Sequence, residues 1–131
     1  MKTCYLIEDD IDDQDVFLLA LNEIDKTIRC DIANNGYDAV QQLNTKTDYT
    51  PDYIFMDVNM PKMNGLETLV YLKRQDRYAR ITVAIYSTFT DARLVEQYRK
   101  LGAALVLTKP SRMEDYSTLV NNILNLLNQR T

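Results

Sequence analysis

The sequence predicts one α/β domain in which a five-stranded parallel sheet lies between two layers of helices. Short apolar runs alternate five times with stretches of helical periodicity along the 131 residues, which is the pattern of consecutive βα units. A chain of this length, 1–131, is the size of one domain that buries its own core. Polar residues follow four of the five runs, at the ends that a parallel sheet gathers along one edge.

The first half of the chain is predicted to hold three strands and two helices. The strands are Cys4–Ile7, Ile28–Ala33 and Tyr53–Met56. The first helix carries apolar residues at i, i+3, i+4 and i+7, namely Phe17, Ala20, Leu21 and Ile24. Asn34-Asn35-Gly36 predicts a turn before a short helix that contains Ala39, Val40 and Leu43. The third strand delivers Asp57 at its C-terminal end.

The second half repeats the pattern with strands at Ile81–Tyr86 and Leu105–Leu107. Pro61 and Gly65 bracket a loop before a helix with Leu66, Leu69 and Val70. The next helix, with Leu94, Tyr98 and Leu101, is followed by Gly102 as a C′ glycine. The last helix has the clearest apolar stripe, made of Tyr116, Leu119, Val120, Ile123, Leu124 and Leu127.

Composition indicates a globular protein of the cytoplasm. Apolar residues make up 46% and charged residues 26% of the chain, an ordinary balance. No apolar run approaches the roughly 20 residues of a membrane span. The N-terminal segment MKTCYLIEDD meets carboxylates too early for a secretory signal. We therefore expect no membrane insertion.

The distribution of charge, cysteine and histidine excludes several classes of function. The net charge is −4, and six carboxylates fall among residues 8–15, so direct nucleic-acid binding has little support. Cys4 and Cys30 are isolated in apolar stretches, which favours two buried thiols over a disulfide or a metal site. The chain has no histidine, which removes the usual Ser-His-Asp and Cys-His arrangements and the common zinc sites.

Three carboxylates are expected to meet at the carboxyl edge of the sheet. Glu8 and Asp9 follow the first strand, and Asp57 ends the third. Carboxylates that converge on one pocket repel one another unless a cation compensates, and oxygen ligands favour Mg²⁺. Alone, acidic residues at a strand–helix junction are more often helix caps, the role we assign to Asp10. The presence of Asp57 at the same edge favours a magnesium site.

Asp57, Ser87 and Lys109 complete a set suited to phosphoryl transfer. A carboxylate beside a metal attacks an electrophilic phosphorus to give an aspartyl phosphate. The hydroxyl of Ser87 and the ammonium of Lys109 are donors for phosphoryl oxygens. Taken separately, each residue has an ordinary explanation: Asp57 as a strand terminator, Ser87 as a cap and Lys109 as a solvated loop residue. Their shared edge favours one site.

In these motifs the chain resembles the receiver domain of bacterial two-component response regulators over nearly its whole length. The motifs are Glu8-Asp9, Asp57 with Met60-Pro61 and Gly65, Ser87, and Lys109-Pro110. The resemblance implies the flavodoxin-like (βα)5 three-layer sandwich with strand order 2-1-3-4-5. It also implies that the protein is a phosphoprotein that acts as a signalling switch rather than as an enzyme. Such a switch assists its own phosphorylation and autodephosphorylation.

The resemblance assigns roles to the site residues and to partners. Asp57 would accept the phosphoryl group from a sensor histidine kinase or a histidine phosphotransfer protein. Asp9 and Asp57 would bind Mg²⁺ directly, Glu8 through water and Asn59 through its backbone carbonyl. Ser87 would move toward the phosphoryl group, and Lys109 would pair with it. We expect a stand-alone receiver that acts on a downstream protein by contact or onward phosphotransfer, with a homodimer on phosphorylation as a further possibility.

Two residues depart from the family's pattern. The family's switch aromatic lies three residues before the lysine, where this chain has Val106, and valine has no ring to move. Tyr98 is the nearest substitute, although amphipathic packing is the simpler interpretation of that residue. Phe89 lies two residues after Ser87, where we expect it to shield the acyl phosphate from water and so to slow loss of the phosphoryl group.

Three other functions are consistent with parts of the pattern. A haloacid-dehalogenase-like phosphatase uses an aspartyl nucleophile, but it needs a second acid two residues later, where Asn59 stands. A degenerate receiver that only binds a partner is disfavoured by the complete set of acid, hydroxyl and lysine. A flavin mononucleotide protein of the flavodoxin type fails because carboxylates after the first strand repel a phosphate unless a metal intervenes.

Overall fold

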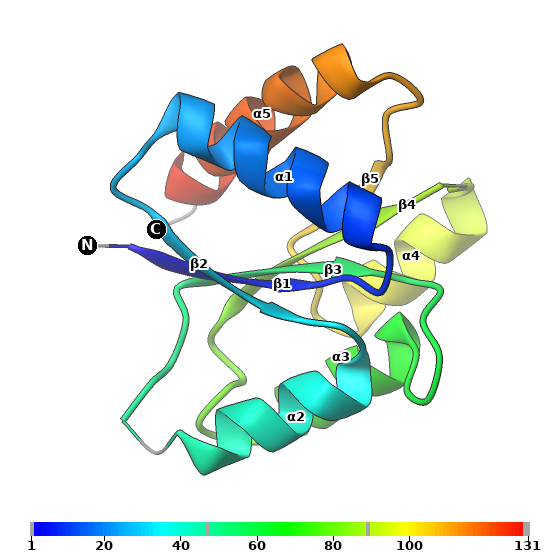
Figure 1. Ribbon diagram of the computed structural model, residues 1–131. Coiled ribbons are helices and arrows are strands. Elements are labelled where there is room, and N and C mark those ends of the chain that lie inside the picture. The colour runs from blue at the N-terminus through cyan, green and yellow to red at the C-terminus, as the bar shows by residue number, and fades with distance from the viewer. Residues whose placement is uncertain (1, 47, 89, 130–131) are drawn as a thin grey trace.

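The computed structural model describes residues 2–46, 48–88 and 90–129, and it is an α/β sandwich of three layers (Figure 1). Five parallel strands form one sheet in the order β2-β1-β3-β4-β5, as predicted. The strands are β1 (Thr3–Ile7), β2 (Arg29–Ala33), β3 (Tyr53–Asp57), β4 (Thr82–Ser87) and β5 (Leu105–Thr108).

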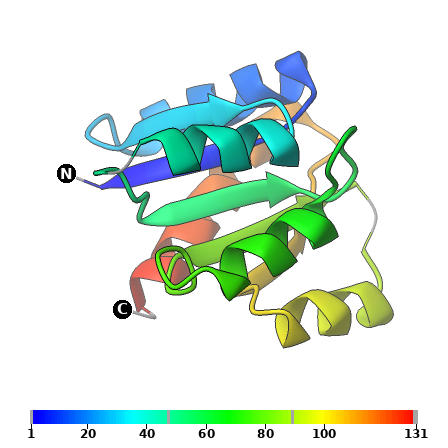
Figure 2. The same cartoon turned by 90° about the horizontal axis from the view of Figure 1, so that it is seen from below.

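The helices divide between the two faces of the sheet. α1 (Ile11–Ile24) and α5 (Tyr116–Gln129) cover one face, with the short 3-10 turn η1 (Met113–Asp115) before α5. The other face carries α2 (Gly36–Thr45), α3 (Gly65–Arg74) and α4 (Ala92–Lys100), side by side in the perpendicular view (Figure 2). This arrangement buries both faces of the central strands, so all five residues of β3 are buried.

Alternation along the strands sorts the core into two clusters, one on each face of the sheet. Cys4, Leu6 and Phe55 pack in the cluster beneath α1 and α5. Tyr5 and Ile54, one position away on the same strands, pack in the cluster of the opposite face. Side chains along a strand point alternately to the two faces of the sheet. The side chain directly after a strand therefore points to the face opposite to that of the strand's last residue.

Side-chain caps determine where four of the helices begin. Asp10 caps α1 by accepting a hydrogen bond from the Asp13 amide at 3.0 Å, which is the role predicted for it. Asn35 and Asp91 cap α2 and α4 in the same way. Asn64 and Glu67 form a capping box at the start of α3. The predicted turn at Asn34-Asn35-Gly36 is therefore the start of α2.

The observed strands differ from the predicted ones by one residue at several ends. Ile28 and Ile81 precede β2 and β4, because their amides donate to turn carbonyls of Asp25 and Tyr78. Gly102 follows α4 with φ +108°, as expected of a C′ glycine. Cys4 is a buried free thiol, whereas the free thiol of Cys30 is only half-buried, because β2 is an edge strand.

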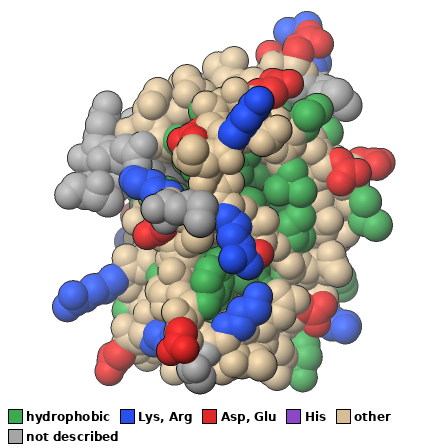
Figure 3. Space-filling model, turned by 60° about the vertical axis from the view of Figure 1, so that its left-hand side comes forward, with side chains coloured by type: hydrophobic (Ala, Val, Ile, Leu, Met, Phe, Trp, Pro, Cys, Tyr) green, Lys and Arg blue, Asp and Glu red, His purple; other side chains and the backbone are tan. Residues whose placement is uncertain are grey.

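The surface carries charges of both signs. On the face shown in Figure 3, lysine and arginine side chains are interspersed with aspartate and glutamate. Within the part of the chain that the structure describes, each helix is too short or too polar to cross a bilayer.

Candidate phosphoryl and metal site

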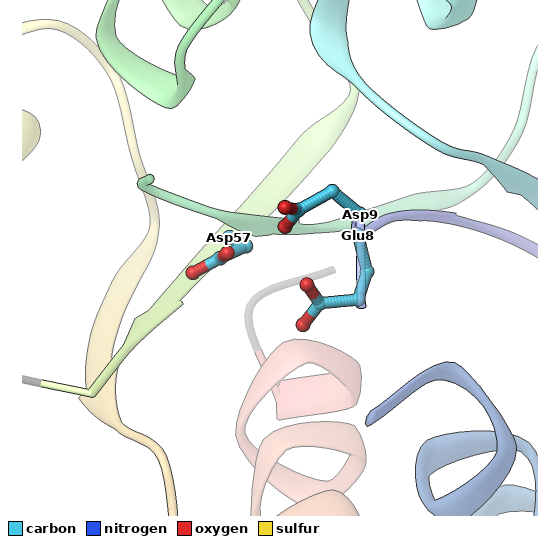
Figure 4. A group of neighbouring side chains, drawn as sticks. All are labelled: Glu8, Asp9 and Asp57. Carbon is cyan, nitrogen blue, oxygen red and sulfur yellow. The ribbon is translucent and has the colours of Figure 1, made fainter. Parts of the chain in front are cut away.

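The carboxyl edge of the sheet brings together Glu8, Asp9 and Asp57. Strand register causes this meeting, because Ile7 pairs with Met56 and the residue after each is an acid. One carboxylate oxygen from each residue lies within 4.8 Å of the others. Figure 4 shows the three side chains reaching from the ends of β1 and β3 toward a common space. Glu8 and Asp57 are buried, and Asp9 is exposed.

Lys109 supplies the positive charge of the site. Its ammonium nitrogen lies 2.7 Å from Glu8 Oε1 and 3.5 Å from Asp57 Oδ1. The residue follows β5 directly, and its backbone amide donates to the Ser87 carbonyl at 2.7 Å. Only 8% of the lysine side chain is exposed, so its ion pairs are shielded from solvent and stronger than surface pairs.

Burial and charge shift the acidities of this group. Burial, with help from the charge of Asp57, raises the pKa of Glu8 to about 7, although Lys109 opposes the shift. Burial also raises the pKa of Asp57 above its ordinary value, against the lowering effect of Lys109. Burial alone would lower the pKa of Lys109, but hydrogen bonds to Glu8 and Asp13 and the charge of Asp57 hold it above its usual range. The pocket therefore has an excess of carboxylate over cation.

That excess fits a divalent cation. Three oxygen donors within mutual reach, two of them buried at raised pKa, are relieved most effectively by a hard ion that keeps several waters. The Asp57 Oδ1 atom also accepts from the Val58 amide at 2.8 Å, which fixes the orientation of this carboxylate. The donor set therefore fits Mg²⁺.

The other predicted site residues lie around this centre. Ser87 is the last residue of β4, buried and paired in register with Thr108. Asn59 is exposed in the loop that follows β3. Val106 is half-buried against the core cluster of the α2–α4 face, to which the buried Tyr98 belongs, so Tyr98 is packing, as the simpler interpretation held. Phe89 lies outside the described residues.

Sequence reasoning missed the contribution of Tyr86. Its hydroxyl donates to Glu8 Oε1 at 3.0 Å, and its ring lies 5.0 Å from the Lys109 ammonium. Glu8, Asp57 and Tyr86 lie on one face across three neighbouring strands, because Asp57 pairs with Tyr86 and Glu8 is next to Asp57. A polar aromatic among the apolar residues of β4 was the only signal in the sequence.

Sequence reasoning also missed a second contact of Lys109. The carboxylate of Asp13, in the first turn of α1, lies 3.0 Å from the lysine nitrogen. In the sequence alone, an acid at this position needs no tertiary partner, because an acid in the first turn of a helix is favoured by the helix dipole.

Comparison with known proteins agrees with this geometry. The family model described as the response regulator receiver domain matches residues 5–121. The chemotaxis protein CheY of Bacillus subtilis is 30% identical over 93 residues, which cover 71% of this chain and 73% of that protein. The Mn²⁺-bound form of the response regulator Rcp1 superposes with a TM-score of 0.81 at 27% identity, covering 94% of this chain and 91% of that chain.

A longer relative matches only in part. A protein-glutamate methylesterase/protein-glutamine glutaminase of Treponema denticola is 40% identical over 86 residues, which are 64% of this chain. The match spans only 22% of that relative's own length. The similarity is therefore to a part of a larger protein.

Proposed function

Because this chain belongs to the family of response regulator receiver domains, we propose that it is a signalling switch that accepts a phosphoryl group on Asp57. The observation that carries the proposal is the convergence of Asp57 with Lys109 at 3.5 Å and with two further acids at the same sheet edge. The proposed donor is a histidine kinase or a histidine phosphotransfer protein, because this sequence contains no histidine that could carry the phosphoryl group itself.

The proposed reaction is a displacement at phosphorus. A carboxylate oxygen of Asp57 forms a bond to phosphorus while the bond from phosphorus to the donor's histidine nitrogen breaks, and the released imidazole takes a proton from solvent. Lys109 neutralises charge on the phosphoryl oxygens. The hydroxyl of Ser87 is the proposed second donor. Hydrolysis resets the switch: a water oxygen bonds to phosphorus while the bond from phosphorus to the Asp57 oxygen breaks, which releases inorganic phosphate and the free carboxylate.

Mg²⁺ is the proposed cofactor of this site. Asp9 and Asp57 would hold it directly, Glu8 through water and Asn59 through its backbone carbonyl. When bound, the ion supplies positive charge beside the transferring oxygens. The raised pKa of Glu8 and Asp57 and the manganese-bound relative support this assignment.

We propose that the phosphorylated protein signals to another protein, either by direct contact or by onward phosphotransfer. A phosphoryl group adds roughly 1.5 to 2 negative charges, enough to bias a surface between two arrangements. Val106 provides no ring for an aromatic relay. A homodimer on phosphorylation and a cytoplasmic location belong to the same proposal.

Acetyl phosphate provides the test. The wild-type protein is incubated with this donor and Mg²⁺, and its intact mass is measured. We expect one labile phosphoryl adduct, its loss in Asp57→Asn, and its retention in Asp12→Asn, a control that removes an exposed acid from α1. Repeated turnover of the donor would indicate a phosphatase instead, and absence of an adduct in the wild type would indicate a degenerate receiver.

A further inference from the structure

Lys109 is held by three acids, and one of them lies outside the cluster suited to a metal. Its nitrogen contacts Glu8 Oε1 at 2.7 Å, Asp13 Oδ2 at 3.0 Å and Asp57 Oδ1 at 3.5 Å. The two shortest contacts of the ammonium are therefore with the acids after β1 and in α1, and its contact with the phosphoacceptor is the longest of the three. Asp13 is not a member of the group within 4.8 Å that suits a cation.

Helix capping does not account for the side chain of Asp13. Asp10 caps α1, and Asp13 contributes only its backbone amide to that cap. Its carboxylate instead reaches out of the first turn to a lysine 96 positions away in the sequence. Asp12, the neighbouring acid of the same turn, is exposed. The contact of Asp13 with Lys109 is therefore a specific tertiary interaction.

The ammonium group has three N–H donors to distribute. Glu8 and Asp13 accept hydrogen bonds from it, and the Tyr86 ring lies beneath it at 5.0 Å. A phosphoryl group on Asp57 would bring up to three strong acceptor oxygens to the same lysine. The Asp13 side chain is 33% exposed whereas that of Glu8 is fully buried, so Asp13 is the partner that solvent can most easily replace.

We propose that Asp13 is a counterion that holds Lys109 in a resting position and competes with the phosphoryl group for it. Phosphorylation then exchanges the Asp13 contact for one to the phosphoryl oxygens, and Asp13 lowers the affinity of the site for that group. This inference rests on the proposed function of Asp57. It assigns Asp13 as a positioning residue that acts through Lys109.

Beryllofluoride, a tetrahedral analogue of an aspartyl phosphoryl group, provides the test. The full chain is titrated with it in saturating Mg²⁺, and binding is followed by amide NMR. We expect Asp13→Asn to bind about three- to fivefold more tightly than Asp12→Asn, on the scale of a partly exposed ion pair. Both variants remove one negative charge from the same turn, so their difference isolates the Lys109 contact.

Two further variants complete the test. Asp13→Glu keeps the charge and can still reach the lysine, so its affinity is expected close to that of the wild type. Asp13→Ala is expected to match Asp13→Asn and replaces it if the latter folds poorly. Equal affinities of Asp13→Asn and Asp12→Asn would overturn the role of Asp13 while leaving Asp57 as the phosphoacceptor. A wild-type protein that neither binds beryllofluoride nor takes a phosphoryl group would overturn both proposals.

Discussion

Single residues at the carboxyl edge have contacts that their neighbours in sequence do not suggest. Tyr86 combines three of them: a hydrogen bond to Glu8, a cation–π contact with Lys109 and a stacked contact with Phe17 at 6.0 Å between ring centroids. Tyr86 therefore connects the Glu8 carboxylate and the Lys109 ammonium to the core beneath α1 and α5. Its hydroxyl is a donor to a buried carboxylate, which is an expensive group to leave unpaired.

Removal of this hydroxyl is expected to destabilise the fold. Tyr86→Phe keeps the ring against Phe17 and Lys109 but takes a donor from the buried carboxylate of Glu8. We expect the free energy of unfolding at pH 8, where Glu8 is ionised, to fall by about 2 kcal/mol, the scale of a hydrogen bond to a charged group, as measured by urea denaturation without metal.

Tyr78→Phe is the matched control for this measurement. Tyr78 is also buried, and its hydroxyl donates to Asn44 at 3.0 Å on the opposite face of the sheet. Asn44 is exposed and neutral, so water replaces the lost partner and the cost is expected to be smaller. A Tyr86→Phe protein as stable as the wild type would show that the hydroxyl contributes nothing to holding Glu8.

At the scale of elements, the loop from β3 to α3 determines how the phosphoacceptor is presented. The Gly65 amide donates to the Val58 carbonyl at 2.9 Å, and this contact closes the loop. Lys62 within it has φ 66°, a left-handed conformation that is uncommon outside glycine. Helix α3 thus begins directly against the end of β3.

Gly65 is required there because of close approach. A Cβ atom at this position would lie 2.7 Å from the Asp57 carbonyl oxygen and 3.0 Å from Val58 Cα, and backbone atoms cannot rotate away. Gly65→Ala is therefore expected to cost about 1–3 kcal/mol of stability, as overpacking does, and to lower the rate of phosphorylation by acetyl phosphate because Asp57 shifts.

Gly102→Ala separates the two effects. Gly102 has φ +108° at the end of α4, so alanine is strained there too, but the residue follows a helix rather than the phosphoacceptor. We expect a loss of stability with an unchanged phosphorylation rate for the folded protein. If Gly65→Ala also left this rate unchanged, the loop would have no role in placing Asp57.

At the scale of the whole molecule, the fold tolerates a pocket that is unfavourable by itself. Glu8 and Asp57 are buried together at the end of adjacent strands, with one lysine between them. Both side chains are shielded from water although Asp9 beside them is exposed. Stability is therefore coupled to whatever neutralises the carboxylates, whether a proton or a cation.

The pH dependence of stability follows from this coupling. The folded-state pKa of Glu8 is about 7, against an ordinary value of 4.5. The proton is thus bound more tightly by the folded state, and its stabilising contribution is complete below the unfolded pKa and lost as pH rises through about 7. Without metal, we expect the free energy of unfolding to be higher at pH 5.5 than at pH 8 by about 1 kcal/mol or more.

A Glu8→Gln variant and added Mg²⁺ distinguish the titration of Glu8 from the titration of other charged groups. Glutamine does not ionise between pH 5.5 and pH 8. In Glu8→Gln the rise in stability on acidification is therefore expected to shrink. Addition of Mg²⁺ is expected to stabilise the wild type more at pH 8 than at pH 5.5, because the ion competes with the proton for the same oxygens. Thermal melts at the two pH values measure both, and a wild-type stability that falls on acidification to pH 5.5 would contradict the assignment.

The sequence by itself predicted the five βα units, with strand ends within a residue or so of the observed ones, and the meeting of Glu8, Asp9, Asp57 and Lys109 at one sheet edge. These follow from local periodicity and from the rule that parallel strands share a carboxyl edge. The strand order came from family resemblance, and the topology confirms it. What only the tertiary structure decided are the contacts of Tyr86 and Asp13, which depend on strand register and on the docking of α1. Local pattern contains no information on either, because register and docking are set by packing between segments far apart in the chain.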